Sequence, residues 1–203
     1  MPTRDQIIAF DDSPPPPGAD PWVEPAVSEP IEIREHDPAW ASCADEVGRQ
    51  LRNALGGRAL QVAHIGPTAV PGLPAKPLLD LDLTVADPDR EQEWLPQLVA
   101  AGFRLTIREP WWYGHRMVAL RAPAANVHVF GPDSPEPLRH LVFRDHLRRH
   151  DADRRLYGQV KRDAAAHANA AQELVMQYNA RKEQVLRAVY ARAFAAAGLL
   201  DDA

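Results

Sequence analysis

The chain has 203 residues, of which 45% are hydrophobic and 25% charged, and its formal net charge is −5. This length and composition are ordinary for one globular domain with appendages, and they allow a sizeable core. The acidic balance argues against a long nucleic-acid interface, because such an interface needs a basic surface. No apolar run approaches the roughly 18 residues that span a bilayer.

The cysteine content and the N-terminal residues bear on the compartment. A single cysteine, Cys43, excludes an intrachain disulfide and favours reducing conditions. The first residues lack the basic-then-apolar order of a secretory signal. We therefore expect a cytoplasmic protein without membrane contact.

The N-terminal segment differs in composition from the rest of the chain. Eight of the twenty prolines fall within the first thirty residues, four of them in a row at 14–17. Such a segment favours extended conformations and has too little apolar surface to fold alone. We predict a disordered, solvated tail over residues 1–29, with docking on a protein partner as the alternative, and a folded domain over residues 30–200.

Strands and helices alternate along the predicted domain. Strands are expected at 31–35, 60–65, 78–85, 103–108, 115–121 and 126–130, and helices from Asp37-Pro38 to Gly56-Gly57 and from about 89 to 101. From about residue 134 to 197 the pattern is helical, with breaks near 150 and 167–170. The sequence thus predicts an α+β fold, a mixed sheet flanked by helices with a helical C-terminal part.

Two acids interrupt the strand at 78–85. Asp80 and Asp82 alternate with leucines, so both carboxylates share one face of the strand, about 7 Å apart at Cα. Acids are uncommon inside strands, and a pair at this spacing can share a metal or a metal bound to phosphate. We predict that Asp80 and Asp82 are metal ligands and catalytic residues.

A glycine turn precedes the acidic strand. The order Ile65-Gly66-Pro67, followed after twelve residues by Asp80-Leu81-Asp82-Leu83, resembles the signature of the DNA polymerase beta-type nucleotidyltransferases. The resemblance implies that the glycine turn receives a triphosphate and that the acids hold magnesium during nucleotidyl transfer. Glycine permits close approach of phosphate, and carboxylate oxygens suit magnesium.

A longer pattern surrounds this signature. It comprises His64-Ile65-Gly66-x-Thr68-Ala69-Val70-Pro71-Gly72-Leu73-x-Ala75-Lys76-Pro77, then Asn126-Val127-His128-Val129-Phe130, Arg139-His140-Leu141, Phe143-Arg144-Asp145, Tyr157-x-x-x-Lys161 and Tyr178-x-x-x-Lys182. Over residues 30–192 the chain is similar to the GrpB family. The resemblance implies a nucleotidyltransferase-like fold, and a related domain is fused to some dephospho-CoA kinases.

Two positions depart from the superfamily pattern. Pro67 replaces the usual serine and offers phosphate neither a hydroxyl nor an N–H, although Thr68 supplies a hydroxyl one residue later. His128 stands where a third acid is expected. Imidazole is a general base near neutral pH and suits zinc or manganese better than magnesium. We expect a divalent metal, with magnesium first and manganese or zinc as alternatives, and a catalytic role for His128 in proton transfer.

The predicted substrate-binding residues are those near the acidic strand or able to bind anions: His64, Gly66, Thr68, Lys76, Arg116, Asn126, Arg139 and Arg144. His115 and Arg116 alternate in facing, and Arg116 is the better anion clamp. Arg139 and Arg144 either contact the ligand or form an ion pair involving Asp145. For His64 the alternative is a structural histidine bonded to the loop backbone.

Three functions are compatible with these residues. The first is metal-dependent transfer of a nucleotidyl group from a nucleoside triphosphate to a small acceptor. The second is non-catalytic binding of a nucleotide or phosphorylated metabolite in the same cleft. The third is a folding-assistance or protein-interaction module that uses the proline-rich tail. Pro67 and His128 weigh against the first, and the presence of both Asp80 and Asp82 weighs against the third.

Overall fold

The computed structural model describes residues 1–23 and 30–200. The centre of this described part is a five-stranded sheet with the strand order β1-β2-β5-β4-β3. The strands are β1 (Gln61–Ile65), β2 (Leu79–Thr84), β3 (Arg104–Glu109), β4 (His115–Leu120) and β5 (Ala125–Phe130). β2 and β5 run parallel, and the other neighbours run antiparallel. The mixed sheet and the α+β class are confirmed.

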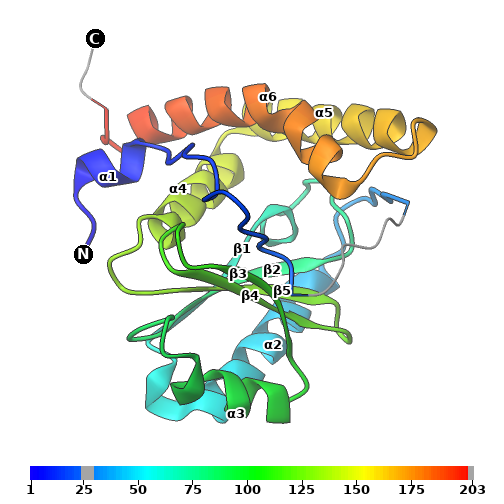
Figure 1. Cartoon of the computed structure of the whole chain (residues 1–203). Coiled ribbons are helices and arrows are strands. Elements are labelled where there is room, and N and C mark those ends of the chain that lie inside the picture. The colour runs from blue at the N-terminus through cyan, green and yellow to red at the C-terminus, as the bar shows by residue number, and fades with distance from the viewer. Residues whose placement is uncertain (24–29, 201–203) are drawn as a thin grey trace.

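Helices cover both faces of this sheet (Figure 1). On one face lie α2 (Ala39–Leu55) and α3 (Leu95–Ala100), and on the other lie α4 (Glu136–Arg149), α5 (Asp151–Ala170) and α6 (Val175–Ala196). The predicted helical C-terminal part is confirmed. No helix of the described residues is both long and apolar enough to cross a membrane.

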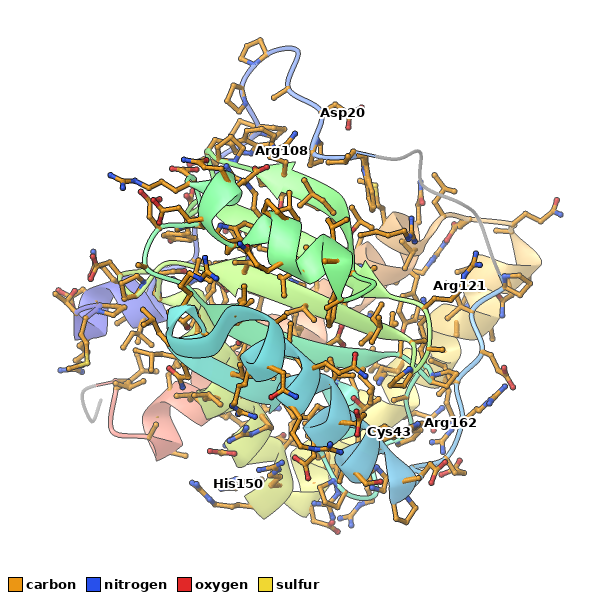
Figure 2. All side chains as sticks on the ribbon, turned by 90° about the horizontal axis from the view of Figure 1, so that it is seen from below. Asp20, Cys43, Arg108, Arg121, His150 and Arg162 are labelled. Atoms are coloured by element: carbon orange, nitrogen blue, oxygen red, sulfur yellow. The ribbon has the colours of Figure 1, made fainter. Side chains whose placement is uncertain are left out.

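The main core lies between the sheet and the layer formed by α2 and α3; in Figure 2 both helices lie in front of the sheet, α2 in light blue to cyan and α3 in green. Leu81 and Leu83 of β2 point into this core, where they join Val47 and Leu51 of α2. Buried residues recur along α2 every three or four positions, as in an amphipathic helix. Because side chains alternate along a strand, the acids of β2 face the opposite side, towards α4, α5 and α6.

Two predicted elements are shorter than expected. Residues 31–35 do not form a continuous strand, since only Arg34 bridges to Ala75. The helix expected over 89–101 is a 3-10 turn at Glu91–Glu93 followed by the short helix α3. Pro96 lies in the first turn of α3 and has no N–H for a longer helix, which explains the interruption.

The N-terminal segment differs from the predicted solvated tail in its described part, residues 1–23. Helix α1 (Arg4–Ile8) is capped by Thr3, and Ile7 and Phe10 pack with Tyr190 and Phe194 of α6. Further along, residues 21–23 add backbone hydrogen bonds to the edge strand β3. The segment has too few apolar side chains to form a core of its own, but these side chains are enough to hold its described part against α6. Residues 24–29 of the predicted tail lie outside the described residues.

Candidate functional site

A cavity of about 550 Å³ lies between the polar face of the sheet and helices α5 and α6. The sheet contributes Asp80, Asn126, His128, Met117 and Ile107; the helices contribute Tyr157, Lys161, Tyr178, Asn179 and Lys182; and loops contribute Trp22, Pro67 and Lys76. Four of the predicted site residues, Asp80, Lys76, Asn126 and His128, therefore meet in one cavity.

Asp80 occupies the sheet wall of this cavity. It pairs with Asn126 of β5, whose side chain hydrogen-bonds the carboxylate. Burial raises the pKa of Asp80 to about 6, although the nearby charge of Lys161 acts in the opposite direction. Gly66 has a φ of 68°, and a Cβ there would lie 2.7 Å from Oδ2 of Asp80. The predicted phosphate-binding glycine thus makes room for the Asp80 carboxylate.

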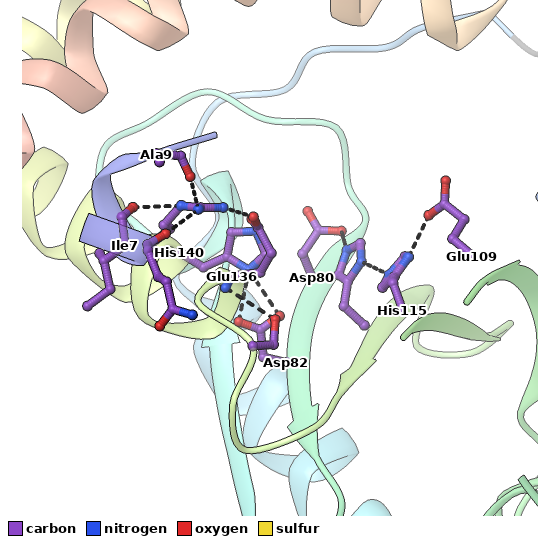
Figure 3. A network of polar contacts seen from close by, with 12 residues as sticks. Ile7, Ala9, Asp80, Asp82, Glu109, His115, Glu136 and His140 are labelled. Carbon is purple, nitrogen blue, oxygen red and sulfur yellow. Dashed lines mark hydrogen bonds and ion pairs between the residues drawn. The ribbon is translucent and has the colours of Figure 1, made fainter. Parts of the chain in front are cut away.

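Asp82 lies two residues further along β2 but is closed off from the cavity. It is buried, and both of its carboxylate oxygens accept a hydrogen bond from Nδ1 of His140, at 3.1 and 2.9 Å. Burial acts to lower the pKa of His140, but the Asp82 carboxylate and, to a smaller extent, that of Asp80 act to raise it, and the net shift is upward. Asp82 and His140 therefore form a buried ion pair between β2 and α4 (Figure 3).

His128 ends a hydrogen-bonded chain that crosses the sheet (Figure 3). Oε2 of Glu109 lies 2.7 Å from Nδ1 of His115, and Nε2 of His115 lies 3.0 Å from Nδ1 of His128. Because a carboxylate only accepts, His115 donates through Nδ1, which leaves its Nε2 as the acceptor for Nδ1–H of His128. Burial holds the pKa of His128 well below its usual value. Its unprotonated Nε2 faces the cavity, 4.0 Å from Oδ1 of Asp80.

The cavity holds every lysine of the chain. Of 23 lysine and arginine residues only three are lysines, Lys76, Lys161 and Lys182, and all three line the cavity, whereas no arginine does. None of the three forms an ion pair with a carboxylate among the described residues. Burial and the charge of Lys76 lower the pKa of Lys182 to about 8. The cavity thus receives positive charge from Lys76 and Lys182 that is not held in an ion pair, and Asp80 is the carboxylate that lines it.

The predicted metal site does not fit this arrangement. Only Asp80 reaches the cavity, because the oxygens of Asp82 are both occupied by His140. No group of three or more histidine, cysteine, aspartate or glutamate side chains in the described part of the chain is arranged to hold a metal ion. The neighbouring lysines also disfavour a bare divalent cation beside Asp80. We therefore assign no metal-dependent step to these residues.

Two residues of the glycine loop lie away from the cavity. His64 pairs with Leu81 across the sheet, so its side chain lies on the face opposite Asp80. Its Nε2 lies 3.0 Å from Oγ1 of the buried Thr68, and burial lowers the pKa of His64 to about 4. His64 thus contacts a side chain of the loop and not the loop backbone, and its ring lies on the face of the sheet opposite Asp80.

The three predicted arginines also lie outside the cavity. Arg116 is buried on the other face of β4, where it forms ion pairs with Asp89 and Glu91. Arg144 donates to Asp145 and to the carbonyl oxygen of His64, at 2.8 and 2.9 Å. These placements correct the prediction that Arg116 and Arg144 bind substrate, since their guanidinium groups stabilise the fold.

Arg139 is the most deeply buried of the three arginines. It forms an ion pair with Glu136 and donates to the carbonyl oxygens of Gln6, Ile7 and Ala9 in the N-terminal segment. Its donors are therefore directed at backbone oxygens and not at the cavity. In place of the predicted ligand contact, Arg139 thus makes contacts that anchor α1. Their partners Ile7, Ala9 and Glu136 are labelled in Figure 3.

Four residues of the cavity and of the histidine chain are not among the site residues predicted from the sequence: Lys161, Lys182, His115 and Glu109. The signal for the lysines was present, since Tyr157 and Lys161, like Tyr178 and Lys182, are four residues apart and share one helix face. A count of lysines would also have singled them out.

Comparisons with known proteins agree with this architecture. The family model described as GrpB protein matches residues 30–192. A UPF0157 protein of Halalkalibacterium halodurans is 43% identical over 137 residues, which cover 68% of this chain and 70% of that one. A UPF0157 protein of Streptomyces coelicolor is 42% identical over 132 residues, which cover 65% and 69%.

Two further comparisons place the fold. A dephospho-CoA kinase of Mycolicibacterium paratuberculosis is 30% identical over 191 residues, but the match covers 81% of this chain and only 46% of the kinase. The crystal structure of the conserved protein GrpB from Enterococcus faecalis matches with a TM-score of 0.70 and 26% identity, covering 82% of this chain and 99% of that one. With its family match, its relatives and its fold in agreement, the chain belongs to the GrpB family.

Proposed function

We propose that this protein binds a nucleotide or another phosphorylated small molecule in the lysine-lined cavity. The observation that carries the proposal is that all three lysines of the chain line one cavity and none of them forms an ion pair among the described residues. The ammonium groups of Lys76 and Lys182, in a partly buried site, favour a multiply charged anion. Phosphate groups would lie against Lys76 and Lys182.

The remaining walls accommodate the uncharged part of such a ligand. Trp22, Ile107 and Met117 give the cavity apolar surface, and Asn126 adds a side chain that both donates and accepts hydrogen bonds. A volume of about 550 Å³ suits a ligand of nucleotide size. The partial likeness to a dephospho-CoA kinase, whose name implies a phosphorylated substrate, supports the same ligand class.

Nucleotidyl transfer is the second candidate. It is favoured by Asp80 and His128, which place a carboxylate and an unprotonated imidazole nitrogen in the same cavity. The ion pair between Asp82 and His140 weighs against it, since the second acid is engaged elsewhere. Release of pyrophosphate from a nucleoside triphosphate with magnesium or manganese, lost in Asp80→Asn, would favour transfer over binding.

Isothermal titration calorimetry tests the binding proposal. The full chain is titrated with pyrophosphate, ATP, GTP, CTP, UTP and dephospho-CoA, with magnesium and with a chelator. Lys76→Met and Lys182→Met should each weaken binding by about tenfold, the order expected for one charge-assisted contact. Arg121→Met, which removes an exposed charge away from the cavity, should leave the affinity unchanged. The proposal would be refuted if none of the probes binds. It would also be refuted if Lys182→Met and Arg121→Met change the affinity equally.

A further inference from the structure

Lys161 differs from the other two lysines in its surroundings. Its side chain is buried, with an exposed fraction of 2%, and Nζ has no hydrogen-bond partner within the described residues. Lys182, in contrast, is only half-buried and donates to Oδ1 of Asn179 at 3.0 Å. Both Nζ atoms also lie over a tyrosine ring, that of Tyr157 for Lys161 and that of Tyr178 for Lys182. Lys161 is therefore the one of the three lysines that is buried at the cavity without a hydrogen bond.

Burial of an unpartnered ammonium group is unfavourable, so the uncharged amine is the preferred form. Burial, together with the charge of Lys182, holds the pKa of Lys161 well below its ordinary value. Arginine could not serve in this way, because its guanidinium does not lose its proton in proteins. An uncharged amine that lines a cavity is a nucleophile.

We propose that Nζ of Lys161 forms an imine with the aldehyde or ketone group of a phosphorylated ligand. The inference rests on the proposed function in one respect, since Lys76 and Lys182 would hold the phosphate. It goes beyond that function by assigning a covalent step and a carbonyl group to the ligand. The geometry that supports it is the unpartnered, buried Nζ at a cavity that also contains Asp80 and His128.

The step is balanced without any further reactant. Nζ attacks the carbonyl carbon, the carbon–oxygen double bond opens, and a carbinolamine forms. The carbon–oxygen bond then breaks, and the oxygen leaves as water with the two protons that the amine carried. Asp80 and His128 are the groups in the cavity that can donate and accept these protons. One C=N bond replaces one C=O bond, and nothing is oxidised or reduced.

Reductive trapping tests this step on the full-length chain. Pyridoxal 5′-phosphate serves as the phosphorylated aldehyde, sodium borohydride reduces the imine, and mass spectrometry of peptides locates the adduct. The chain offers a clean assay because it has only three lysines besides its N-terminal amine. We expect one adduct per chain, on Lys161, and no adduct at this position in Lys161→Arg.

Two comparisons separate the imine from the phosphate site. Unphosphorylated pyridoxal should label Lys161 about tenfold more slowly than the phosphorylated probe, and Lys182→Arg should retain the Lys161 adduct. Binding of pyrophosphate or ATP without labelling of Lys161 would overturn the imine and leave the proposed function standing. Equal labelling of Lys161 by both aldehydes, without protection by pyrophosphate, would support the imine and contradict the phosphate role.

Labelling confined to Lys76, Lys182 or the N-terminal amine would overturn the inference. The wild-type peptide map decides this point even when a Lys161 variant fails to fold.

Discussion

Nε2 of His115 lies 3.0 Å from Nδ1 of His128, and the two rings stack with their centroids 5.3 Å apart. Because Glu109 accepts a hydrogen bond from Nδ1 of His115, it orients the His115 ring, and His115 in turn orients His128 at the cavity. His128 itself touches no carboxylate through Nδ1, so its tautomer depends on a neighbour that does not line the cavity. Nε2 of His128 is therefore left without a proton because Glu109, through His115, holds the proton of His128 on Nδ1.

Replacement of His115 by phenylalanine should change the tautomer of His128. Phenylalanine preserves the ring contacts with Phe130 and Trp112 but removes the acceptor for Nδ1–H. We expect His128 to move its proton to Nε2, where it faces Asp80, and the free energy of unfolding to fall by about 1–3 kcal/mol. Long-range ¹H–¹⁵N NMR of the histidine rings measures the tautomer. An unchanged His128 spectrum in His115→Phe would show that the chain of contacts does not set it.

The alternation along β2 was enough to predict that Asp80 and Asp82 share a face. It could not predict that only one of them would reach the cavity. The partner of Asp82, His140, lies 58 residues away in sequence, and its position depends on how α4 packs across the sheet. The shared strand face therefore singled out two carboxylates, of which Asp80 lines the cavity and Asp82 forms an ion pair with His140.

The same limit explains the arginines and the histidine chain. Alternation predicted that at most one of His115 and Arg116 points inward, and charge favoured Arg116. The structure directs His115 inward, because Asp89 and Glu91 neutralise Arg116 on the other face. Residue type alone does not reveal such partners, since Asp89 and Glu91 come from the turn before α3, where the sequence predicted a regular helix.

Asp80→Asn should stabilise the protein at neutral pH. The folded-state pKa of Asp80, about 6, lies above its ordinary value of 3.8, so the fold favours the protonated carboxyl. Its contribution to stability is greatest below pH 3.8 and is lost as the pH rises through 6. At pH 7 the variant should gain about 2 kcal/mol, and its free energy of unfolding should fall less between pH 4 and 7. Urea unfolding of the wild type and the variant across this pH range measures the gain and its pH dependence. If the free energies of unfolding of the two chains change with pH in parallel, the raised pKa of Asp80 is contradicted.

Asp82→Asn should have the opposite effect. The substitution removes the partner of His140, whose pKa the Asp82 carboxylate raises, and leaves a buried imidazole without its counter-charge. We expect a loss of about 3 kcal/mol in the free energy of unfolding at pH 6, where the ion pair contributes most. This contribution is lost as the pH rises above the ordinary histidine pKa and through the raised one. Equal effects of Asp80→Asn and Asp82→Asn would show that the two acids do not differ in environment.

Gly66→Ala should displace the Asp80 carboxylate. A Cβ at this position would lie 2.7 Å from Oδ2 and 2.9 Å from Cβ of Asp80, on a backbone with a φ of 68°. We expect a loss of about 2–4 kcal/mol and weaker binding of pyrophosphate. Gly56→Ala is the matched control, since Gly56 also has a positive φ, 56°, but a Cβ there meets nothing within 4 Å. Similar losses of stability in both variants, measured by urea unfolding, would contradict the steric argument.

The last prediction concerns Arg139 and the N-terminal segment. Deletion of residues 2–10 removes the carbonyl oxygens of Gln6, Ile7 and Ala9 and leaves a buried guanidinium with Glu136 as its one remaining contact among these acceptors. We expect the deletion to lower the free energy of unfolding by about 3 kcal/mol in the chain with Arg139.

The deletion should be less harmful once Arg139 is replaced. In Arg139→Met there is no guanidinium whose donors could lose their acceptors. The same deletion should therefore lower the free energy of unfolding by at least about 1 kcal/mol less than it does in the chain with Arg139. The double-mutant cycle by urea unfolding isolates this coupling. The ion pair between Glu136 and Arg139 is absent from Arg139→Met both with and without the deletion, so its loss cancels in the cycle. Additive effects of the deletion and Arg139→Met would mean that α1 is held by its apolar contacts with Tyr190 and Phe194 alone.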